Sequence, residues 1–514
     1  MQPVRTVTIV GGGTAGWMTA AALSQWLTKV EIRLIESEEI GTIGVGEATI
    51  PHIRNFLPLA GIDPLAMIAR TKASFKLGIQ FVGWGAEGES YVHGFGKIGR
   101  DMLWLHTHQL WLAARERGLP LRSFDHYALN CAAALRNRFC FPDARNPQSP
   151  LADLDYAYHF DASLFARFLR KESEQRGVRR IEGRIVAVDV NGEWGEVERV
   201  RLADGRELDG DLWVDCSGMR ALLIGEALGV GYEDWSHWLP CDRAQAVPCE
   251  SVSPLTPYTR ATARAAGWQW RIPLQHRIGN GIVYSSALMS DEQAAETLLG
   301  SLDGAPLGDP RPVRFAPGRR LEAWRRNVVA IGLSSGFLEP LESTSIHLIQ
   351  TGIQRLLAMF PANGMAEPDI AEFNRQARFE MEDVRDFIIA HYAVTRRTGE
   401  PFWDHVRTMA VPDSLAERLA LFASSGRFFK HGAAELFAEE SWVQVLLGQG
   451  FAARADPVTR FVDDRALGGF LGEVEEVIAD VAGRMPDHGA FVAGLPERSP
   501  RSSAPAVSFG PVVR

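Results

Sequence analysis

The first hydrophobic segment of the chain, residues 5–10, is short and rich in β-branched side chains, which predicts a strand. A glycine-rich turn, residues 11–16, follows it directly. The apolar residues 17–23 then predict a helix, and residues 31–35 predict a second strand. A strand, a glycine turn, a helix and another strand in this order are typical of a dinucleotide-binding unit.

The turn has the spacing Gly-x-Gly-x-x-Gly. Gly11 permits a tight turn, Gly13 lets the backbone approach a pyrophosphate, and Gly16 lets the helix pack closely. The phosphates would lie at the positive end of the helix. Glu36 ends the second strand 25 positions after Gly11, near the usual place of the acid that binds a ribose hydroxyl. These residues do not distinguish FAD from NAD, and the alternative is a glycine-rich turn in an unrelated α/β unit.

Residues 211–218 and 327–333 also read as strands that run into glycine turns, whereas residues 44–51 indicate a loop that enters a helix. Three strand-to-glycine units spread over 330 residues imply a nucleotide domain assembled from distant segments. We therefore expect an α/β fold with the box-like FAD-binding domain of the aromatic hydroxylases, rather than a compact NAD domain.

Within residues 74–82, apolar residues from Phe75 to Phe81 alternate with Lys76, Gly78 and Gln80, which predicts one strand with one apolar face. On spacing alone, Lys76 is a solvated lysine on the polar face. A further strand is predicted over residues 267–273, which Pro273 would end. Because residues two apart in a strand share a face, Trp268 and Trp270 would present their rings side by side.

Residues 336–346 are dense in candidate chemistry. Ser343 or Thr344 can cap a helix that runs on through Leu348 and Ile349. The uncommitted N–H groups of its first turn would suit a small anion such as halide. Glu342 lies just before them, where the alternative is an acid favoured by the helix dipole alone.

Composition narrows the possible partners. The chain has 514 residues, of which 46% are hydrophobic and 23% charged, and its formal net charge is −9. This charge argues against nucleic-acid and anionic-membrane partners. The five cysteines have no metal-binding spacing, so we expect no metal site and a reducing, cytoplasmic location. We expect no signal peptide and no membrane-spanning helix, since no apolar run is long enough.

Three motifs together resemble the flavin-dependent tryptophan halogenases. They are Trp-x-Trp-x-Ile-Pro at residues 268–273, Phe-Lys-x-x-Ile-x-Phe at 75–81, and Glu-Pro-Leu-Glu-Ser-Thr at 339–344. Weaker matches are His-x-Phe-Gly at 93–96 and the helical region around 391–403. The resemblance extends from about residue 5 to residue 450.

The resemblance implies a role for each matched residue. Lys76 and Glu342 would be catalytic, and the amides of Thr344 and Ser345 would hold the halide, although Ser345 stands where the family usually has glycine. The resemblance also implies that the substrate lies between His93 and Phe95. Trp268 and Trp270 would separate the flavin from the substrate. Besides the glycine turn and Glu36, FAD would contact Thr14, Ala15, Ala48, Leu333 and Ile346.

The chemistry implied is oxidation of halide by reduced FAD and oxygen to hypohalous acid, which travels to Lys76. Lys76 would either donate a hydrogen bond as an ammonium or be halogenated as a neutral amine, and the second route requires a pKa lowered by burial. Only one dinucleotide unit is visible, so an NAD(P)H-dependent flavin reductase would supply FADH2 as a transient partner.

The substrate is less determined. The chain has no tyrosine after Tyr392, and residues 439–448 lack the tyrosine pair with which family members hold free tryptophan. We therefore expect a small aromatic such as indole, with a peptide or larger natural product as the alternative, and bromide to work at least as well as chloride. The rival functions are a single-component FAD aromatic monooxygenase and a non-catalytic flavin-binding protein.

The predicted organisation has three parts. Residues 1–345 form the FAD domain, with segments around 90–150 lining the substrate site, residues 346–493 form a mainly helical domain that caps the substrate, and residues 494–514 form a tail. The sequence leaves open whether the protein is a monomer or a homodimer.

Overall fold

The computed structural model describes residues 3–39, 46–432 and 434–495. Its first large sheet has six strands, and five of them run parallel. The strands are, in spatial order, β20 (Trp324–Arg325), β21 (Val328–Ala330), β12 (Leu212–Asp215), β1 (Thr6–Val10), β2 (Glu31–Glu36) and β8 (Arg179–Glu182). The three predicted strand-to-glycine units are neighbours here, as β1, β12 and β21, which confirms a domain assembled from distant segments.

Helices cover this sheet because its strands are apolar on both faces, as is usual in parallel sheets. Ile9 and Val10, which point to opposite faces of β1, are both buried. Helix α1 (Thr14–Trp26) is buried from Gly16 to Ser24 and packs on α6 (Ala162–Gln175) and α8 (Ser345–Ala358). The start of α1 is therefore fixed beside the carboxyl end of β1.

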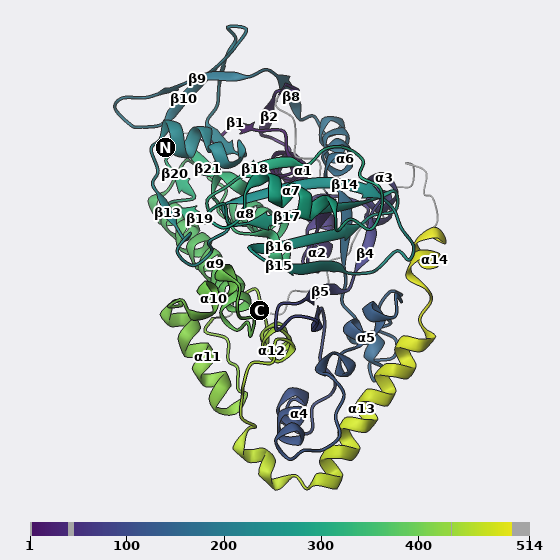
Figure 1. The fold of residues 1–514 in the computed structure, drawn as a ribbon. Helices are drawn as coiled ribbons and strands as arrows, with labels where there is room; N and C mark the ends of the chain where they lie inside the picture. Colours follow the sequence, from purple (N-terminus) through teal and green to yellow (C-terminus); the bar gives the residue numbers. More distant parts are fainter. Residues whose placement is uncertain (1–2, 40–45, 433, 496–514) are drawn as a thin grey trace.

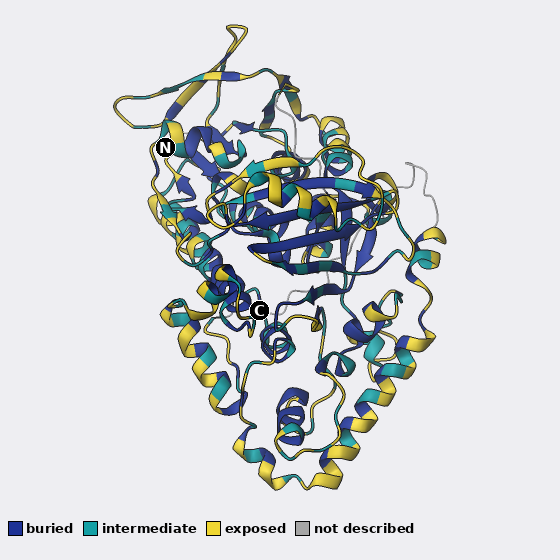
Figure 2. Cartoon of the chain, viewed as in Figure 1, coloured by how far each residue is buried: buried dark blue, intermediate teal, exposed yellow. Residues whose placement is uncertain are grey.

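The second large sheet contains the tryptophan strand. Its seven strands are antiparallel except for the β15–β5 pair. They are β18 (Arg311–Arg314), β14 (Arg243–Glu250), β17 (Arg277–Tyr284), β16 (Gly267–Pro273), β15 (Thr259–Arg264), β5 (Gly78–Val82) and β6 (Ser90–Gly94). Every residue of β16 is buried, and the sheet's central strands are dark blue in Figure 2.

The single strand predicted over residues 74–82 is wrong. The segment forms two strands, β4 (Ser74–Lys76) and β5, which belong to different sheets. The chain turns at Leu77, whose N–H donates to the carbonyl of Pro257. Because both faces of β4 are covered, Lys76 is fully buried, so the solvated lysine expected from spacing is also wrong.

The loop predicted over residues 44–51 is likewise only partly correct. Residues 44–45 lie outside the described residues, and β3 (Gly46–Ala48) follows them, paired with β7 (Ala157–Asp161), which also pairs with β4. A turn then leads into α2 (Ile53–Leu59). The glycines and the proline in this segment concealed a strand of three residues.

The smaller sheets and helices complete the first 345 residues. Two three-stranded sheets contain β9 (Ile185–Val190), β10 (Val197–Leu202) and β11 (Glu207–Asp209), and β13 (Tyr232–Asp234), β19 (Gly318–Arg320) and β22 (Gly336–Phe337). The remaining α-helices here are α3 (Pro64–Thr71), α4 (Thr107–Glu116), α5 (Leu129–Leu135) and α7 (Asp291–Leu299).

The chain after α8 is helical, as predicted. It contains α9 (Glu367–Ala393), α10 (Pro401–Thr408), α11 (Asp413–Ser425), α12 (Glu439–Gly448), α13 (Asp464–Arg484) and α14 (His488–Ala493). Helix α13, yellow in Figure 1, runs past α4 and α5, so segments from both halves of the chain lie side by side. Hydrophobic clusters also join both halves, and the boundary at residue 345 stays a prediction. Among the described residues, none of the helices is both long and apolar enough for a membrane span.

Candidate active site

A cavity of about 950 Å³ lies between the two large sheets and is lined by residues of both. Nearly every residue predicted to bind the cofactor lines it: Gly11, Gly13, Thr14, Ala15, Glu36, Ala48, Leu333 and Ile346. Gly16 does not line the cavity but packs against the carbonyl of Gly11. A cavity of this size at the carboxyl ends of parallel strands is the usual place for a dinucleotide.

The three glycines of the turn differ in what surrounds them. A Cβ on Gly11, whose φ is +113°, would lie 2.2 Å from the carbonyl oxygen of Cys216, and a Cβ on Gly16 would lie 1.8 Å from that of Gly11. A Cβ on Gly13 would meet no protein atom within 4 Å. Gly11 and Gly16 are therefore required by the fold itself, whereas Gly13 leaves space at the start of α1 for a ligand.

Glu36 ends β2 at the cavity wall as predicted, but its carboxylate already has partners. It accepts a hydrogen bond from Trp17 Nε1 at 3.2 Å and forms an ion pair with Arg180. A Cβ on Gly12 would overlap the Glu36 carboxylate, so Gly12 is needed to admit this side chain. Gly12 and Trp17 therefore also shape the cavity wall at Glu36, although no sequence pattern indicated a role for them.

The second sheet supplies apolar cavity wall. Trp268 and Trp270 lie on one face of β16 with ring centroids 6.1 Å apart, as expected for residues two apart in a strand. Ile272 and Phe315 extend the same wall. This end of the cavity is suited to a flat aromatic ring system, whereas Arg167 and Arg170 offer charge at its edge near Glu36.

Lys76 lies directly behind this cavity. Its Nζ donates to the hydroxyl of Ser343 at 2.8 Å and to the carbonyl of Thr49 at 3.1 Å. Ser343 and Ala48, the neighbour of Thr49, both line the cavity. Burial lowers the pKa of Lys76 to about 7, and the nearby Glu342 only partly opposes this shift.

Glu342 is held by two histidines from distant segments. His93 Nδ1 donates to its carboxylate at 3.0 Å, and His391 Nε2 donates to Oε1 at 2.8 Å. Burial alone would raise the pKa of Glu342, but its interactions with His93 and His391 outweigh burial and lower the pKa to about 2. Nδ1 of His391 faces the carbonyl of Phe387 at 2.7 Å, so both ring nitrogens of His391 lie against acceptors.

The two residues predicted to hold the substrate lie beside this pair. The Phe95 ring centroid is 5.3 Å from Lys76 Nζ, within reach of a cation–π contact. His93 is buried, and its imidazole is committed to Glu342. The Gln444 side chain of α12 accepts from the N–H of Gly94 and donates to its carbonyl, both at 2.9 Å, which fixes the end of β6 between His93 and Phe95.

Helix α8 starts beside the cavity, at the predicted halide site. Thr344 is its N-cap, and Ser345, its first residue, lines the cavity. The first amides of a helix have no intrahelical acceptor. The Thr344 hydroxyl is buried and has no hydrogen-bond partner among the described residues. Ser345 has helical backbone, so replacing the family's glycine leaves its amide in place.

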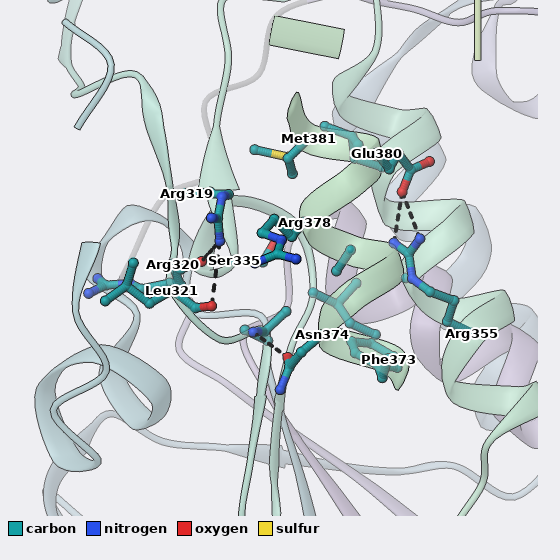
Figure 3. A pocket seen from close by; sticks show the side chains of 16 residues that line it. Arg319, Arg320, Leu321, Ser335, Arg355, Phe373, Asn374, Arg378, Glu380 and Met381 are labelled. Atoms are coloured by element: carbon teal, nitrogen blue, oxygen red, sulfur yellow. Dashed lines mark hydrogen bonds and ion pairs between the residues drawn. The ribbon is translucent and has the colours of Figure 1, made fainter. Parts of the chain in front are cut away.

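A second, much smaller cavity of about 30 Å³ lies behind α8 (Figure 3). In Figure 3, Arg355 of α8 reaches across to Glu380 of α9, with which it makes hydrogen bonds of 2.8 Å. His347 Nε2 donates to the same carboxylate at 3.1 Å. These bonds fix α8, and therefore its N-terminus, against α9.

Two further observations concern residues outside the predicted set. Among the described residues, no three His, Cys, Asp or Glu side chains gather as a metal site would require. Sequence reasoning also missed Ser343, His391, Glu339 and Tyr392 as parts of the site, since their partners are 49 to 267 positions away in the chain.

Comparison with known proteins agrees with this geometry. Residues 6–464 match the family model described as tryptophan halogenase. The chain is 34% identical to tryptophan 6-halogenase SttH of Streptomyces toxytricini, over 96% of this chain and 98% of that protein.

Two solved structures are closer in sequence. The flavin-dependent halogenase Xcc4156 from Xanthomonas campestris superposes with a TM-score of 0.92 at 48% identity, covering 96% of this chain and 99% of its own. BrvH, a flavin-dependent halogenase from Brevundimonas sp. BAL3, gives 0.91 at 48% identity, with 96% and 100% covered. The chain therefore belongs to the tryptophan halogenase family of flavin-dependent halogenases, enzymes that use reduced FAD to halogenate aromatic substrates.

Proposed function

We propose that this enzyme halogenates an electron-rich small aromatic such as indole, and that bromide serves it at least as well as chloride. The observation that carries the proposal is the placement of Lys76 and Glu342 behind the wall of the large cavity, beside Phe95. Reduced flavin, oxygen, halide, a proton and the aromatic would give oxidised flavin, two waters and the halogenated ring.

The residues of the large cavity fit FAD. The space over Gly13 and the start of α1 suit a pyrophosphate, and the apolar wall of Trp270, Ile272 and Phe315 suits the isoalloxazine ring. When bound in its reduced form, FAD would supply the electrons that convert oxygen and halide into an electrophilic halogen. Flavin-dependent halogenases are two-component systems, and we propose an NAD(P)H-dependent reductase as the partner that supplies FADH2.

Thr344 and Ser345 would hold the halide. The free amides at the start of α8 and the unpartnered Thr344 hydroxyl give an anion three donors close to the cavity. Bromide is easier to oxidise and easier to dehydrate than chloride, so an equimolar mixture should give more brominated than chlorinated product. An excess of chlorinated product would contradict the halide preference.

Lys76 and Glu342 would act on the substrate side. With a pKa near 7, Lys76 is present at neutral pH both as an ammonium that can polarise hypohalous acid and as an amine that can be halogenated. Glu342, kept anionic by its histidines, would stabilise the cationic ring intermediate or accept its proton.

The choice of indole rests on α12. SttH acts on tryptophan, as its name states. In this chain α12 offers Trp442 and Gln444, both buried, and no tyrosine follows Tyr392. A substrate without charged amino and carboxylate groups therefore suits this site better than free tryptophan.

The test is to supply purified enzyme with chemically reduced FAD, oxygen, bromide and a panel of indoles, and to identify products by mass spectrometry with and without bromide. Bromoindole is expected, with turnover when a flavin reductase and NADH replace the chemical reductant. Hydroxylated product would favour a monooxygenase, and no product from any aromatic would favour a flavin-binding protein. Turnover with NADPH and no reductase would refute the two-component proposal.

A further inference from the structure

Glu339 is a buried carboxylate that the chemistry above does not use. It lies three positions before Glu342, immediately before the short 3-10 turn Pro340–Glu342. The side chain is fully buried. Burying an acid is costly unless its hydrogen bonds are satisfied, so its partners are informative.

The Glu339 cluster consists of Glu339, Trp268 and Tyr392. Trp268 Nε1 donates to Glu339 Oε2 at 2.9 Å, and the Tyr392 hydroxyl donates to the same oxygen at 2.5 Å. The other oxygen, Oε1, is buried and has no hydrogen-bond partner among the described residues. Burial raises the pKa of Glu339 to about 7, although the two hydrogen bonds oppose the rise.

The cluster joins the flavin side of the site to the substrate side. Trp268 lines the large cavity on β16, and Tyr392 lies near the end of α9. Its neighbour His391 holds Glu342. The successive α9 residues His391 and Tyr392 thus bind Glu342 and Glu339, respectively. Glu339 in addition binds Trp268 in the cavity wall.

We propose that Glu339 is a positioning residue, which fixes the Trp268 indole in the wall of the flavin cavity and keeps that wall in register with Glu342 and His391. Its removal would leave two buried donors unpaired, so the indole and the end of α9 would shift. This inference rests on the proposed function, because the wall is expected to keep oxidising equivalents directed toward the substrate side.

The test compares Glu339→Leu, which removes the acceptor at similar size, with Glu339→Gln, whose amide oxygen can still accept from Trp268 and Tyr392. Glu417→Leu, at an exposed position of α11, is the matched control. Two quantities are measured for each variant of the full chain. The first is brominated product per reduced FAD oxidised, the remainder being hydrogen peroxide formed as reduced flavin passes two electrons and two protons to oxygen.

The second quantity is independent of turnover. Protein labelled with 5-fluorotryptophan gives ¹⁹F resonances from its 14 tryptophans, and Trp268→Phe identifies that of Trp268. We expect Glu339→Leu to shift or broaden this resonance and to lower product per flavin roughly fivefold or more, whereas Glu339→Gln and Glu417→Leu stay close to the native enzyme.

The proposal is overturned if Glu339→Leu keeps the native resonance and product yield, or if Glu339→Gln loses as much as Glu339→Leu. Should Glu339→Leu not fold, Tyr392→Phe and Trp268→Phe, which each remove one donor, must both lower product per flavin for the proposal to stand. If the native enzyme brominates no aromatic, the proposed function fails, and the ¹⁹F spectra still test the position of Trp268.

Discussion

For Lys76, the family motif predicted a functional lysine, whereas the prediction of its solvent exposure was wrong. Alternation predicted that it lies on a solvated face, because the pattern continues unbroken from Phe75 to Phe81. The structure divides that segment between two sheets and buries the amine between Thr49 and Ser343. Only the family motif pointed to a functional lysine, since the covering residues come from positions that no local pattern connects.

Lys76→Met should abolish halogenation and stabilise the fold. The folded pKa is about 7, below the ordinary value of 10.5, so the unfolded chain binds more protons between these values and stability rises with pH across that window. Removing the amine should therefore raise the free energy of unfolding by about 1–3 kcal/mol at pH 7. Thermal unfolding measures the change in stability, and halogenated product is measured together with the rate of flavin oxidation. The control is Lys171→Met, at an exposed position of α6. Retained halogenation would remove Lys76 from its role.

Glu342→Gln should lower the rate of halogenation by roughly 10²-fold, because an amide can neither take the proton nor supply a negative charge to the cationic ring intermediate. Flavin oxidation should stay near the native rate, since Glu342 does not line the large cavity in which we propose that FAD binds. Product formation in single turnover measures the effect, with the exposed Glu367→Gln as control. An unchanged rate would exclude Glu342 from the chemistry.

At the scale of elements, the sequence was most informative where residue types or their spacing directly favour one backbone conformation. The glycine turn, α1, the tryptophan strand and the start of α8 all follow from local patterns. Strand β3 was missed and β4 was joined to β5, because three residues are too few for a period to show. The site also depends on α9, whose His391 and Tyr392 face partners that only tertiary packing brings near.

Helix α14 connects the end of the described chain to the strand of Lys76 through one histidine. His488 Nε2 accepts from the backbone N–H of Phe75 at 3.2 Å, and Nδ1 faces the carbonyl of Leu255 at 2.9 Å. This pattern requires the neutral ring. Burial lowers the pKa of His488 to about 4, so below pH 6.5 the unfolded chain binds more protons and the protein loses stability down to pH 4.

His488→Gln should reduce this acid sensitivity, since glutamine can accept from Phe75 and donate to Leu255 without titrating. Between pH 7.5 and 5, the free energy of unfolding should fall by about 1–2 kcal/mol more in the native protein than in the variant, as measured by urea unfolding at both pH values. His405→Gln, exposed on α10, should behave like the native protein. Equal losses in all three proteins would show that α14 does not sense pH.

For the whole molecule, the overall architecture followed from the sequence better than its internal divisions. An FAD-type α/β fold followed by helices was predicted and is confirmed. Hydrophobic clusters that span both halves are invisible to a reading along the chain, because they depend on which distant segments meet. The C-terminal tail from residue 496 lies outside the described residues.

The cavity between the sheets makes a prediction about ligand-linked stability. Gly13→Ala places a methyl group in open space, so the protein without FAD should keep its melting temperature and lose most of the stabilisation that FAD gives the native protein. Gly16→Ala should instead destabilise the protein without FAD, because its methyl group would overlap the carbonyl of Gly11. Thermal shift assays with and without FAD separate the two. A full FAD shift in Gly13→Ala would place the pyrophosphate elsewhere.

The cavity wall at Ala48 and Ser343 has a consequence for engineering. Both residues line the large cavity, while Ser343 and Thr49, the neighbour of Ala48, accept the hydrogen bonds of Lys76. A substitution that makes room for a bulkier substrate near Lys76 will therefore also alter cofactor affinity. Variants selected for a wider substrate range need to be compared at saturating flavin, because at low flavin a productive new pocket and a weakened cofactor site would cancel in the measured rate.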